Sequence, residues 1–224
     1  MRLDLDMQRI RLIVFASAAS LLAAGPARAD RLDEVLARMN EAGKLLKTMS
    51  ADFVQTDHDY LLKDQEETRG KLYLSVPGRI RWEHAPPRKK VLLVTDDLVR
   101  VYNPAAHQVH EFRRGKGAKS GGADLLIGFG SGNEKIRETH DATLLEETDS
   151  SVALSLQPKD PATSLFTKIE LTLDKKTWTP VRSVFHSPNR NRADIVFENV
   201  VLNRDLPPGT FELKLPPNVE IIRN

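Results

Sequence analysis

The sequence contains no cysteine, and this absence removes several classes of protein. It excludes disulfides, thiolate metal sites, cysteine nucleophiles and a lipid-modified cysteine at the start of a mature chain. Aromatic residues make up only 6% of the 224 residues. No stretch reaches the roughly 18 consecutive apolar residues that a membrane-spanning helix needs. The hydrophobic fraction of 40% is nevertheless ordinary for a globular domain, which argues against wholesale disorder.

The chain also lacks a real charge imbalance. Totals of 33 basic and 31 acidic residues include four arginines and two aspartates in the first 29 residues, and the rest of the chain holds 29 of each. The basic surplus therefore belongs to a segment that we expect to be removed, and no nucleic-acid partner is predicted.

The N-terminus resembles an export signal. Arg9 and Arg11 precede an uncharged run over residues 12–24, which would span only about 20 Å as a helix against a hydrocarbon core of about 30 Å. Gly25-Pro26 ends the run, and Ala27-Arg28-Ala29 supplies the small residues of a signal-peptidase site. We predict a signal peptide over residues 1–29 and one mature domain over residues 30–224 in the periplasm. The alternative is an N-terminal anchor that is never cleaved.

The mature chain begins with a helical pattern and continues with a strand pattern. Apolar residues recur at helical spacing from Asp30 to Met49, and the period then changes to two. Short turn signals, such as Pro77-Gly78, separate the alternating segments and leave no room for helical crossovers. We therefore expect an antiparallel sheet of eleven strands, near residues 51–57, 67–76, 78–83, 90–95, 98–103, 107–112, 142–148, 151–158, 165–174, 180–187 and 192–203.

A glycine-rich insert over residues 115–140 interrupts the strands. Within it, residues 123–129 predict a short apolar helix set among seven glycines, which favours a hinged element. We predict a mainly β (α+β) fold, in which one curved sheet forms a half-open barrel and the helices lie over its apolar concave side. Periodicity does not decide whether that side is a filled core or an apolar cavity.

Motifs for catalysis and metal binding are missing. His107 and His110 fall on opposite faces of an expected strand, and the other four histidines are scattered. The segment around Ser131 lacks the outer glycines of a nucleophile elbow, and Ala118 interrupts the only phosphate-loop-like stretch. We expect no cofactor, no metal and no enzymatic activity. A basic run at Arg113, Arg114, Lys116 and Lys119 is read as a solvated hairpin edge, with docking to an acidic protein or anionic lipid surface as the alternative.

Several segments, in a fixed order, resemble the periplasmic lipoprotein carrier proteins of Gram-negative bacteria, the LolA family. The most specific segment is residues 70–82, GKLYLSVPGRIRW. The similarity spans nearly all of the mature chain. In chain order the other segments are residues 51–55, 93–96, 101–104, 125–126 and 203–206, followed by Phe211, Pro217 and Val219.

The resemblance implies a half-open barrel whose helical lid covers a cavity for lipoprotein acyl chains. Two departures from the family pattern leave the control of lid opening undefined: Val76 stands where many relatives have an arginine, and Asp96-Asp97 replaces an Asp-Gly turn. Alternation along the strands then predicts the residues that bind the chains. We expect the cavity wall to include Phe53, Leu72, Leu74, Val76, Ile80 and Trp82, and the lid to include Leu125, Leu126 and Phe129.

The function that the resemblance implies is a monomeric shuttle for acylated lipoproteins. It would receive them from an inner-membrane lipoprotein-releasing ABC transporter and deliver them to the outer membrane, where an acceptor lipoprotein is a further possible partner. The alternative is another periplasmic lipid-binding or envelope stress-sensing protein of half-barrel shape. A membrane-tethered acceptor would need a lipidated cysteine that this chain lacks, and the stress regulators of this shape carry a second domain.

Overall fold

One curved sheet of twelve strands dominates the computed structural model, which describes residues 25–113, 129–130 and 133–223, with side chains from Arg31 onward. The strand order is β12-β6-β5-β4-β3-β2-β1-β11-β10-β9-β8-β7. The strands are β1 (Thr48–Asp59), β2 (Asp64–Ser75), β3 (Arg79–His84), β4 (Lys90–Val94), β5 (Leu98–Asn103), β6 (Gln108–Arg113), β7 (His140–Glu147), β8 (Ser151–Pro158), β9 (Lys168–Asp174), β10 (Pro180–His186), β11 (Arg192–Leu202) and β12 (Glu220–Arg223).

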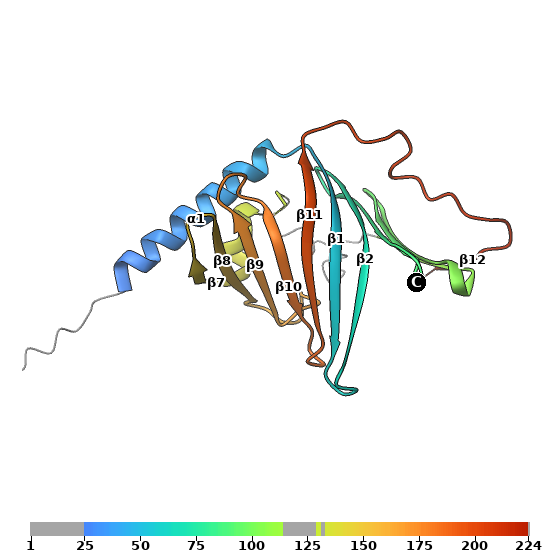
Figure 1. The fold of residues 1–224 in the computed structure, drawn as a ribbon, viewed down its shortest axis with the longest axis horizontal. Coiled ribbons are helices and arrows are strands. Elements are labelled where there is room, and N and C mark those ends of the chain that lie inside the picture. The colour runs from blue at the N-terminus through green and yellow to red at the C-terminus, as the bar shows by residue number, and fades with distance from the viewer. Residues whose placement is uncertain (1–24, 114–128, 131–132, 224) are drawn as a thin grey trace, which may run out of the picture.

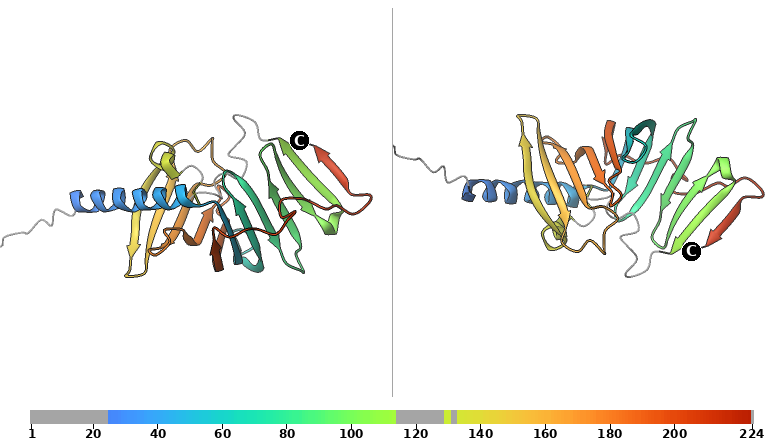
Figure 2. Two further views of the ribbon diagram at one scale, coloured as in Figure 1. Left: turned by 90° about the horizontal axis from the view of Figure 1, so that it is seen from above. Right: turned by 90° about the horizontal axis from the view of Figure 1, so that it is seen from below.

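The sheet consists of two antiparallel meanders, β1 to β6 and β7 to β11, joined where β1 pairs with β11. All eleven expected strands are present, and the predicted half-open barrel is confirmed, since the edge strands β7 and β12 lie at opposite ends of the sheet (Figures 1 and 2). The expectation of a purely antiparallel sheet is wrong, because β12 pairs with β6 in parallel. A four-residue strand is too short to show a period, so the sequence did not reveal it.

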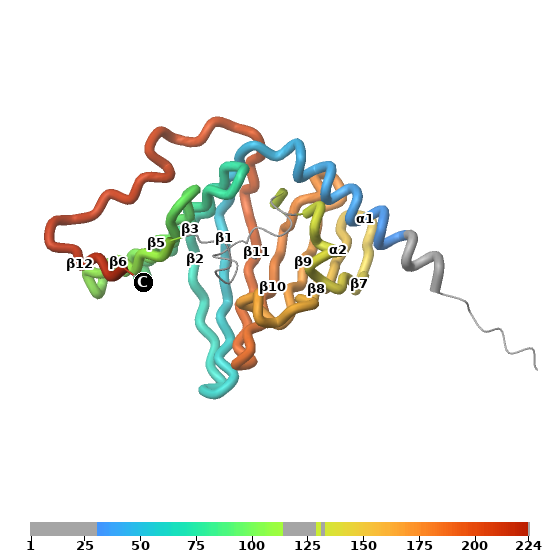
Figure 3. The backbone as a smooth tube through the Cα atoms, turned by 180° about the vertical axis from the view of Figure 1, so that it is seen from behind, coloured from blue at the N-terminus to red at the C-terminus, as the bar shows by residue number. Residues whose placement is uncertain are grey.

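Helix α1 (Gly25–Leu45) lies across one end of the sheet, near β7, β8 and β9 (Figures 1 and 3). It ends four residues earlier than the expected limit at Met49, which belongs to β1. Met49 is fully buried and fits both periods, because it stands three residues after Leu46 and two before Ala51. The predicted cleavage after Ala29 falls inside this helix and would leave it starting at its sixth residue. None of the helices in the described ranges is long and apolar enough to span a bilayer.

A close backbone contact holds α1 to residues 129–130. A Cβ added to Gly43 would lie 2.7 Å from the Cα of Gly130, so a side chain at this position would push the two segments apart. The side-chain amide of Asn133 donates a hydrogen bond of 3.2 Å to the carbonyl of Met39. Two short helices continue from there, η3 (Asn133–Lys135) and α2 (Ile136–Thr139). The predicted helix over residues 123–129 lies outside the described residues except for Phe129.

The chain after β11 crosses the convex face of the sheet before it forms β12 (Figure 1). There Leu213, Leu215 and Val219 pack against a small buried cluster of Val91, Tyr102 and Val109. Arg81 anchors this segment, since its Nη1 donates to the carbonyl of Glu212 at 3.0 Å and to that of Thr210 at 3.4 Å. Strands β4 and β5 therefore have apolar packing on both faces.

Candidate functional site

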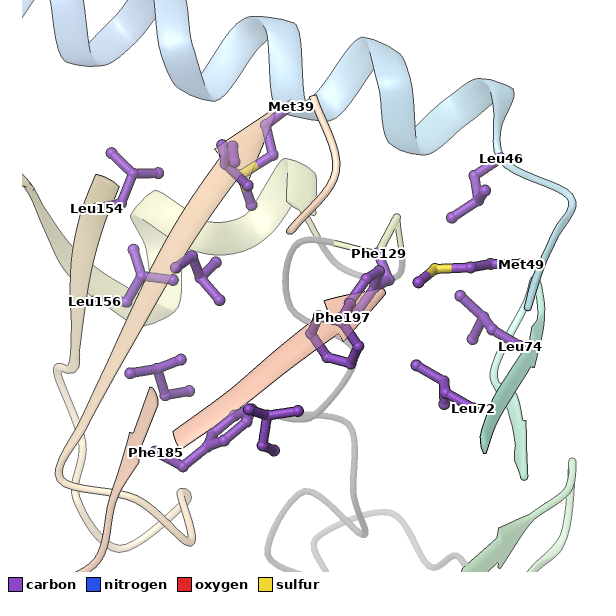
Figure 4. Close-up of a cluster of buried hydrophobic side chains, with 14 of the residues drawn as sticks. Met39, Leu46, Met49, Leu72, Leu74, Phe129, Leu154, Leu156, Phe185 and Phe197 are labelled. Atoms are coloured by element: carbon purple, nitrogen blue, oxygen red, sulfur yellow. The ribbon is translucent and has the colours of Figure 1, made fainter. Parts of the chain in front are cut away.

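The concave face of the sheet is apolar across both meanders. Alternate side chains of β1, β2 and β3 meet alternate side chains of β8 to β11 beneath α1, and together they form one buried cluster (Figure 4). Antiparallel pairing places these apolar side chains on one face of the sheet, because residues that pair directly across two strands point to the same side. The core members from the second meander are Val152, Leu154, Leu156, Ile169, Leu171, Leu173, Phe185, Ile195 and Phe197.

The structure brings most of the predicted site residues together on this face. Leu72 pairs with Ala51 on one side and Trp82 on the other, and Leu74 pairs with Met49 and Ile80 in the same way. Val76, just beyond the end of β2, is partly buried against the cluster. Leu125 and Leu126 lie outside the described residues. The remaining members, Phe53, Leu72, Leu74, Ile80, Trp82 and Phe129, are at most 5% exposed.

Aromatic rings form the centre of the cluster. The ring of Trp82 lies 4.9 Å from that of Phe53 and 6.1 Å from that of Phe197, and the ring of Phe129 stands edge-on to Phe197 at 5.2 Å. These separations fall in the range of favourable aromatic pairs. Phe197 was missed as a site residue, although its alternation with Ile195 in the expected strand over residues 192–203 was a usable signal.

The end of the concave face near α1 is filled with side chains. Leu46, Met49, Leu74 and Phe129 point toward one another there (Figure 4), and each is at most 4% exposed. Packing of this kind is typical of a protein core, which leaves few voids larger than a water molecule. Most of the residues predicted to line a cavity therefore form a packed core in this state of the protein.

The open part of the concave face lies one step further along β1, away from α1. Phe53 pairs with Phe197 at the aromatic centre, and Gln55 pairs with Ile195 beside an apolar cavity of about 260 Å³. Side chains from both meanders line it, and it is open to solvent on one side. The lining residues are Gln55, Trp82, His84, Lys90, Leu92, Val101, Phe166, Phe185, Ala193 and Ile195. Of the predicted site residues that the structure describes, Trp82 alone contacts the empty space.

Three polar side chains line this cavity, those of Gln55, His84 and Lys90. The ring of His84 stands edge-on to Phe53 at 5.2 Å, and its Nδ1 lies 3.3 Å from the hydroxyl oxygen of Thr68. Burial lowers the pKa of His84, and nearby Lys90 lowers it further while Asp57 opposes both. His84 is therefore neutral at pH 7, and Lys90 is the only charged residue among those that line the cavity.

The arrangement suits binding of an apolar ligand more than chemistry on one. No group of three or more histidine, aspartate or glutamate side chains in the described part of the chain is placed to hold a metal ion. His107 lies before β6 with a φ of 52°, so it does not share a strand with His110 as the sequence suggested. Of the basic run, the structure describes only Arg113, at the end of β6.

An open half-barrel with an apolar concave face and an apolar cavity defines a class of protein, the carriers of hydrophobic ligands. The family model for "Outer membrane lipoprotein carrier protein LolA" matches residues 44–214. The chain belongs to the LolA family.

Sequence relatives agree with this assignment, and a solved structure shares the fold. The outer-membrane lipoprotein carrier protein of Azotobacter vinelandii is 26% identical over 217 residues, covering 97% of this chain and all of that protein. That of Chromohalobacter salexigens is 27% identical over 174 residues, covering 78% of this chain and 80% of that protein. A crystal structure of an uncharacterised conserved protein from Thermus thermophilus superposes with a TM-score of 0.54 at 15% identity, covering 86% of this chain and 98% of that one.

Proposed function

We propose that this protein carries lipoproteins through the periplasm by binding their acyl chains on the concave face of the sheet. The observation that supports this most directly is the apolar cavity of about 260 Å³ between the two meanders, in a chain that belongs to the LolA family. The carrier would be exported by the segment over residues 1–29, would act as a monomer through the domain over residues 30–224, and would perform no catalysis.

The physical task is to hide hydrocarbon from water and still release it. Burial of each CH₂ group contributes about 0.8 kcal/mol, and a single myristoyl chain already binds a membrane with a constant of about 10⁴ M⁻¹. A lipoprotein with two or three chains therefore does not cross an aqueous compartment alone. A wall with few polar anchors binds such chains without selecting one protein, which fits a carrier of many cargoes.

The cavity must grow to do this. Its volume lies just below the roughly 300–1,000 Å³ of typical ligand pockets. The packed cluster of Phe53, Trp82, Phe129 and Phe197 adjoins it, so separation of these rings would extend the cavity toward α1. The predicted binding residues Leu72, Leu74, Val76 and Ile80 would then contact the acyl chains. We assign Leu125 and Leu126 to the lid by the same proposal.

The route gives the carrier two membrane partners. An inner-membrane lipoprotein-releasing ABC transporter would supply the cargo, and an acceptor lipoprotein or the outer membrane itself would take it. No step on the carrier needs ATP, because transfer follows the higher affinity of each successive partner for the acyl chains.

The decisive experiment compares two forms of one lipoprotein. The carrier, purified from periplasm, is mixed with a triacylated lipoprotein or with the same protein bearing serine at the modified cysteine, and complexes are measured by native mass spectrometry. We expect a one-to-one complex with the acylated form alone. Equal binding of both forms would contradict a role for the acyl chains, and endogenous acylated protein in the purified sample would support one.

A further inference from the structure

The turn between β1 and β2 exposes an unusual group of apolar side chains. Tyr60 is 50% exposed, Leu61 81% and Leu62 77%. We call residues 60–63 the hairpin tip. The β1–β2 hairpin extends farther from α1 than the neighbouring strands, so the tip is an outer point of the molecule (Figures 1 and 3). A soluble domain has no structural need for two adjacent leucines at such a point.

Hydrogen bonds hold the hairpin tip in one conformation. One carboxylate oxygen of Asp59 accepts the backbone N–H groups of both Leu61 and Leu62, each at 2.9 Å. The backbone N–H of Tyr60 donates to the Asn191 side chain at 3.0 Å, which joins the tip to the neighbouring β10–β11 turn. With its turn bonded locally, the tip presents Leu61 and Leu62 outward before it meets any partner.

The tyrosine of the tip has a polar attachment. Arg190 of the β10–β11 turn donates from Nη1 to the Tyr60 hydroxyl oxygen at 2.6 Å, and its guanidinium lies 4.8 Å from the centre of the ring. A half-exposed tyrosine next to two exposed leucines in the sequence, with its hydroxyl on a charged group, has the character of residues at membrane–water interfaces.

A groove joins the tip to the apolar cavity. Ala193 lines the cavity, and it lines a second groove that reaches Leu62. Asp57 and Arg192 border this groove between the two places. The groove and the cavity therefore adjoin at Ala193, and the groove continues to Leu62 at the tip.

The surroundings of the tip carry no net charge. Four acidic and four basic side chains lie in the tip, its groove and the adjoining turn, so neither anionic lipids nor a strongly charged protein would be attracted from a distance. These residues are Asp57, Asp59, Asp64 and Glu66, and Lys63, Arg88, Arg190 and Arg192.

We propose that the hairpin tip inserts Leu61 and Leu62 into the surface of a lipid bilayer, with Tyr60 at the level of the head groups. Three side chains cannot supply the roughly 800 Å² per partner that a stable protein–protein interface buries, whereas a fluid bilayer accepts a small convex apolar point. The link between this contact and cargo transfer rests on the proposed function: insertion would bring the cavity next to the acyl chains that it takes up or gives back.

The test is vesicle flotation with the mature chain. Wild-type protein should float with phosphatidylcholine vesicles and bind equally at low and high salt. The Leu61→Ser, Leu62→Ser double variant should show a partition coefficient at least about tenfold lower, because two leucines no longer leave water. The matched control is Leu45→Ser, Leu145→Ser, which removes two leucines of 72% and 48% exposure elsewhere and should bind like wild type.

A second measurement locates the contact. Since the chain has no cysteine, Leu61→Cys gives a single thiol for an environment-sensitive fluorophore. Its emission should shift to the blue when vesicles are added, and the same label at Leu45→Cys should not respond. Thermal denaturation of each variant verifies that it is folded.

Several outcomes would overturn the proposal. These are absence of vesicle binding, binding that needs anionic lipid and disappears with salt, and equal binding by wild type and the tip variant. Loss of a dimer in the tip variant, measured by sedimentation, would show that the tip contacts a second copy instead. Binding of free acylated lipoprotein is measured separately: the tip variant should retain it, whereas failure of wild type to bind would contradict the proposed function and leave the vesicle result standing.

Discussion

At the scale of single residues, Gly70 determines whether the aromatic centre can form. It lies opposite Phe53 in the β1–β2 register and opposite His84 in the β2–β3 register, on the concave face. A Cβ at this position would lie 2.1 Å from the carbonyl oxygen of Glu83 and 2.5 Å from the Cζ atom of Phe53. Because Gly70 has no side chain, the Phe53 ring can occupy the space beside its backbone.

We expect Gly70→Ala to reduce the free energy of unfolding by about 1–3 kcal/mol, because the strand and the ring must move to admit one methyl group. Urea denaturation followed by circular dichroism measures the change. Arg69→Ala, a substitution at a neighbouring exposed side chain of the same strand, should cost less than about 1 kcal/mol. Equal losses of stability in Gly70→Ala and Arg69→Ala would show that the close contact with Phe53 does not determine the free energy of unfolding.

Trp82 is the residue where the predicted site and the observed cavity coincide. We expect Trp82→Asp to abolish binding of acylated lipoprotein, because a carboxylate at an apolar wall loses its hydration without a partner. Trp82→Phe keeps an apolar ring and should reduce affinity only slightly. Binding is measured by native mass spectrometry.

A buried aspartate can also unfold the chain, so a second variant keeps this prediction testable. Leu92→Ser alters a partly buried residue on the β4 wall of the same cavity and should weaken binding while the melting transition remains cooperative. Full binding by a folded Leu92→Ser variant would contradict the assignment of this cavity to cargo.

At the scale of elements, ion pairs from Arg31 and Asp33 fasten α1 to the edge of the sheet and to α2. The guanidinium of Arg31 donates to both carboxylate oxygens of Glu147 in β7, at 3.1 Å and 2.5 Å, and Lys175 lies 2.7 Å from the same carboxylate. The hydrogen bond from Arg31 is the main cause that lowers the pKa of Glu147 to about 2, and Lys175 contributes next. Arg137 and Asp33 form a second link between α2 and α1.

This pKa predicts how the stability of the helix depends on pH. The folded-state value of about 2 is below the ordinary value of 4.5, so the stabilisation is complete above pH 4.5 and is lost as the pH falls from 4.5 to 2. We expect Glu147→Gln to cost about 1 kcal/mol or less at pH 7, since the side chains are about one-third exposed.

Thermal unfolding at several pH values measures this effect, and hydrogen exchange of the α1 amides shows where it acts. The difference between Glu147→Gln and wild type should shrink as the pH falls from 4.5 to 2 and vanish below pH 2, where Glu147 is protonated in both the folded and the unfolded state. A difference that stays constant from pH 7 to pH 2 would mean that the carboxylate charge is not its cause.

At the scale of the whole molecule, the two meanders leave a cavity where they face each other, and that void should be fillable. Ala193 of β11 lines it and is partly exposed. We expect Ala193→Leu to keep or raise the free energy of unfolding by up to about 1 kcal/mol, because added methyl groups would occupy empty space. The same change should lower the affinity for acylated lipoprotein. Ala153→Leu in β8, outside the cavity, should leave affinity unchanged.

The opposite result would also be informative. Strong destabilisation by Ala193→Leu, with unchanged binding, would show that the space closes in solution and that cargo enters elsewhere. Calorimetry and the native mass spectrometry assay answer both parts with one protein sample.

Local pattern explains why so much of the fold was predictable from the sequence. Ile80 and Trp82 alternate with Arg79 and Arg81 because one side of β3 is buried on the concave face, and a period of two follows from strand geometry alone. The same reasoning located all eleven longer strands and grouped Phe53, Leu72, Leu74 and Ile80 on one face. The carrier function was predicted from the order of the segments that resemble the LolA family, because the alternation of buried and exposed residues does not indicate a function.

Only the tertiary structure decided where that face is filled and where it is open. Filling depends on side chains that are distant in sequence, such as Met49, Phe129 and Phe197, which meet near α1. Further along, the paired residues Leu92 and Val101 line one wall of the cavity and Phe185 lines the other. The parallel pairing of β12 and the exposure of Leu61 and Leu62 were also decided by the tertiary structure alone. The sequence by itself determined which residues face inward, because that is a property of neighbours along the chain. The curvature of the sheet determined the distance between the two meanders, and hence the cavity, because that distance is a property of the whole sheet.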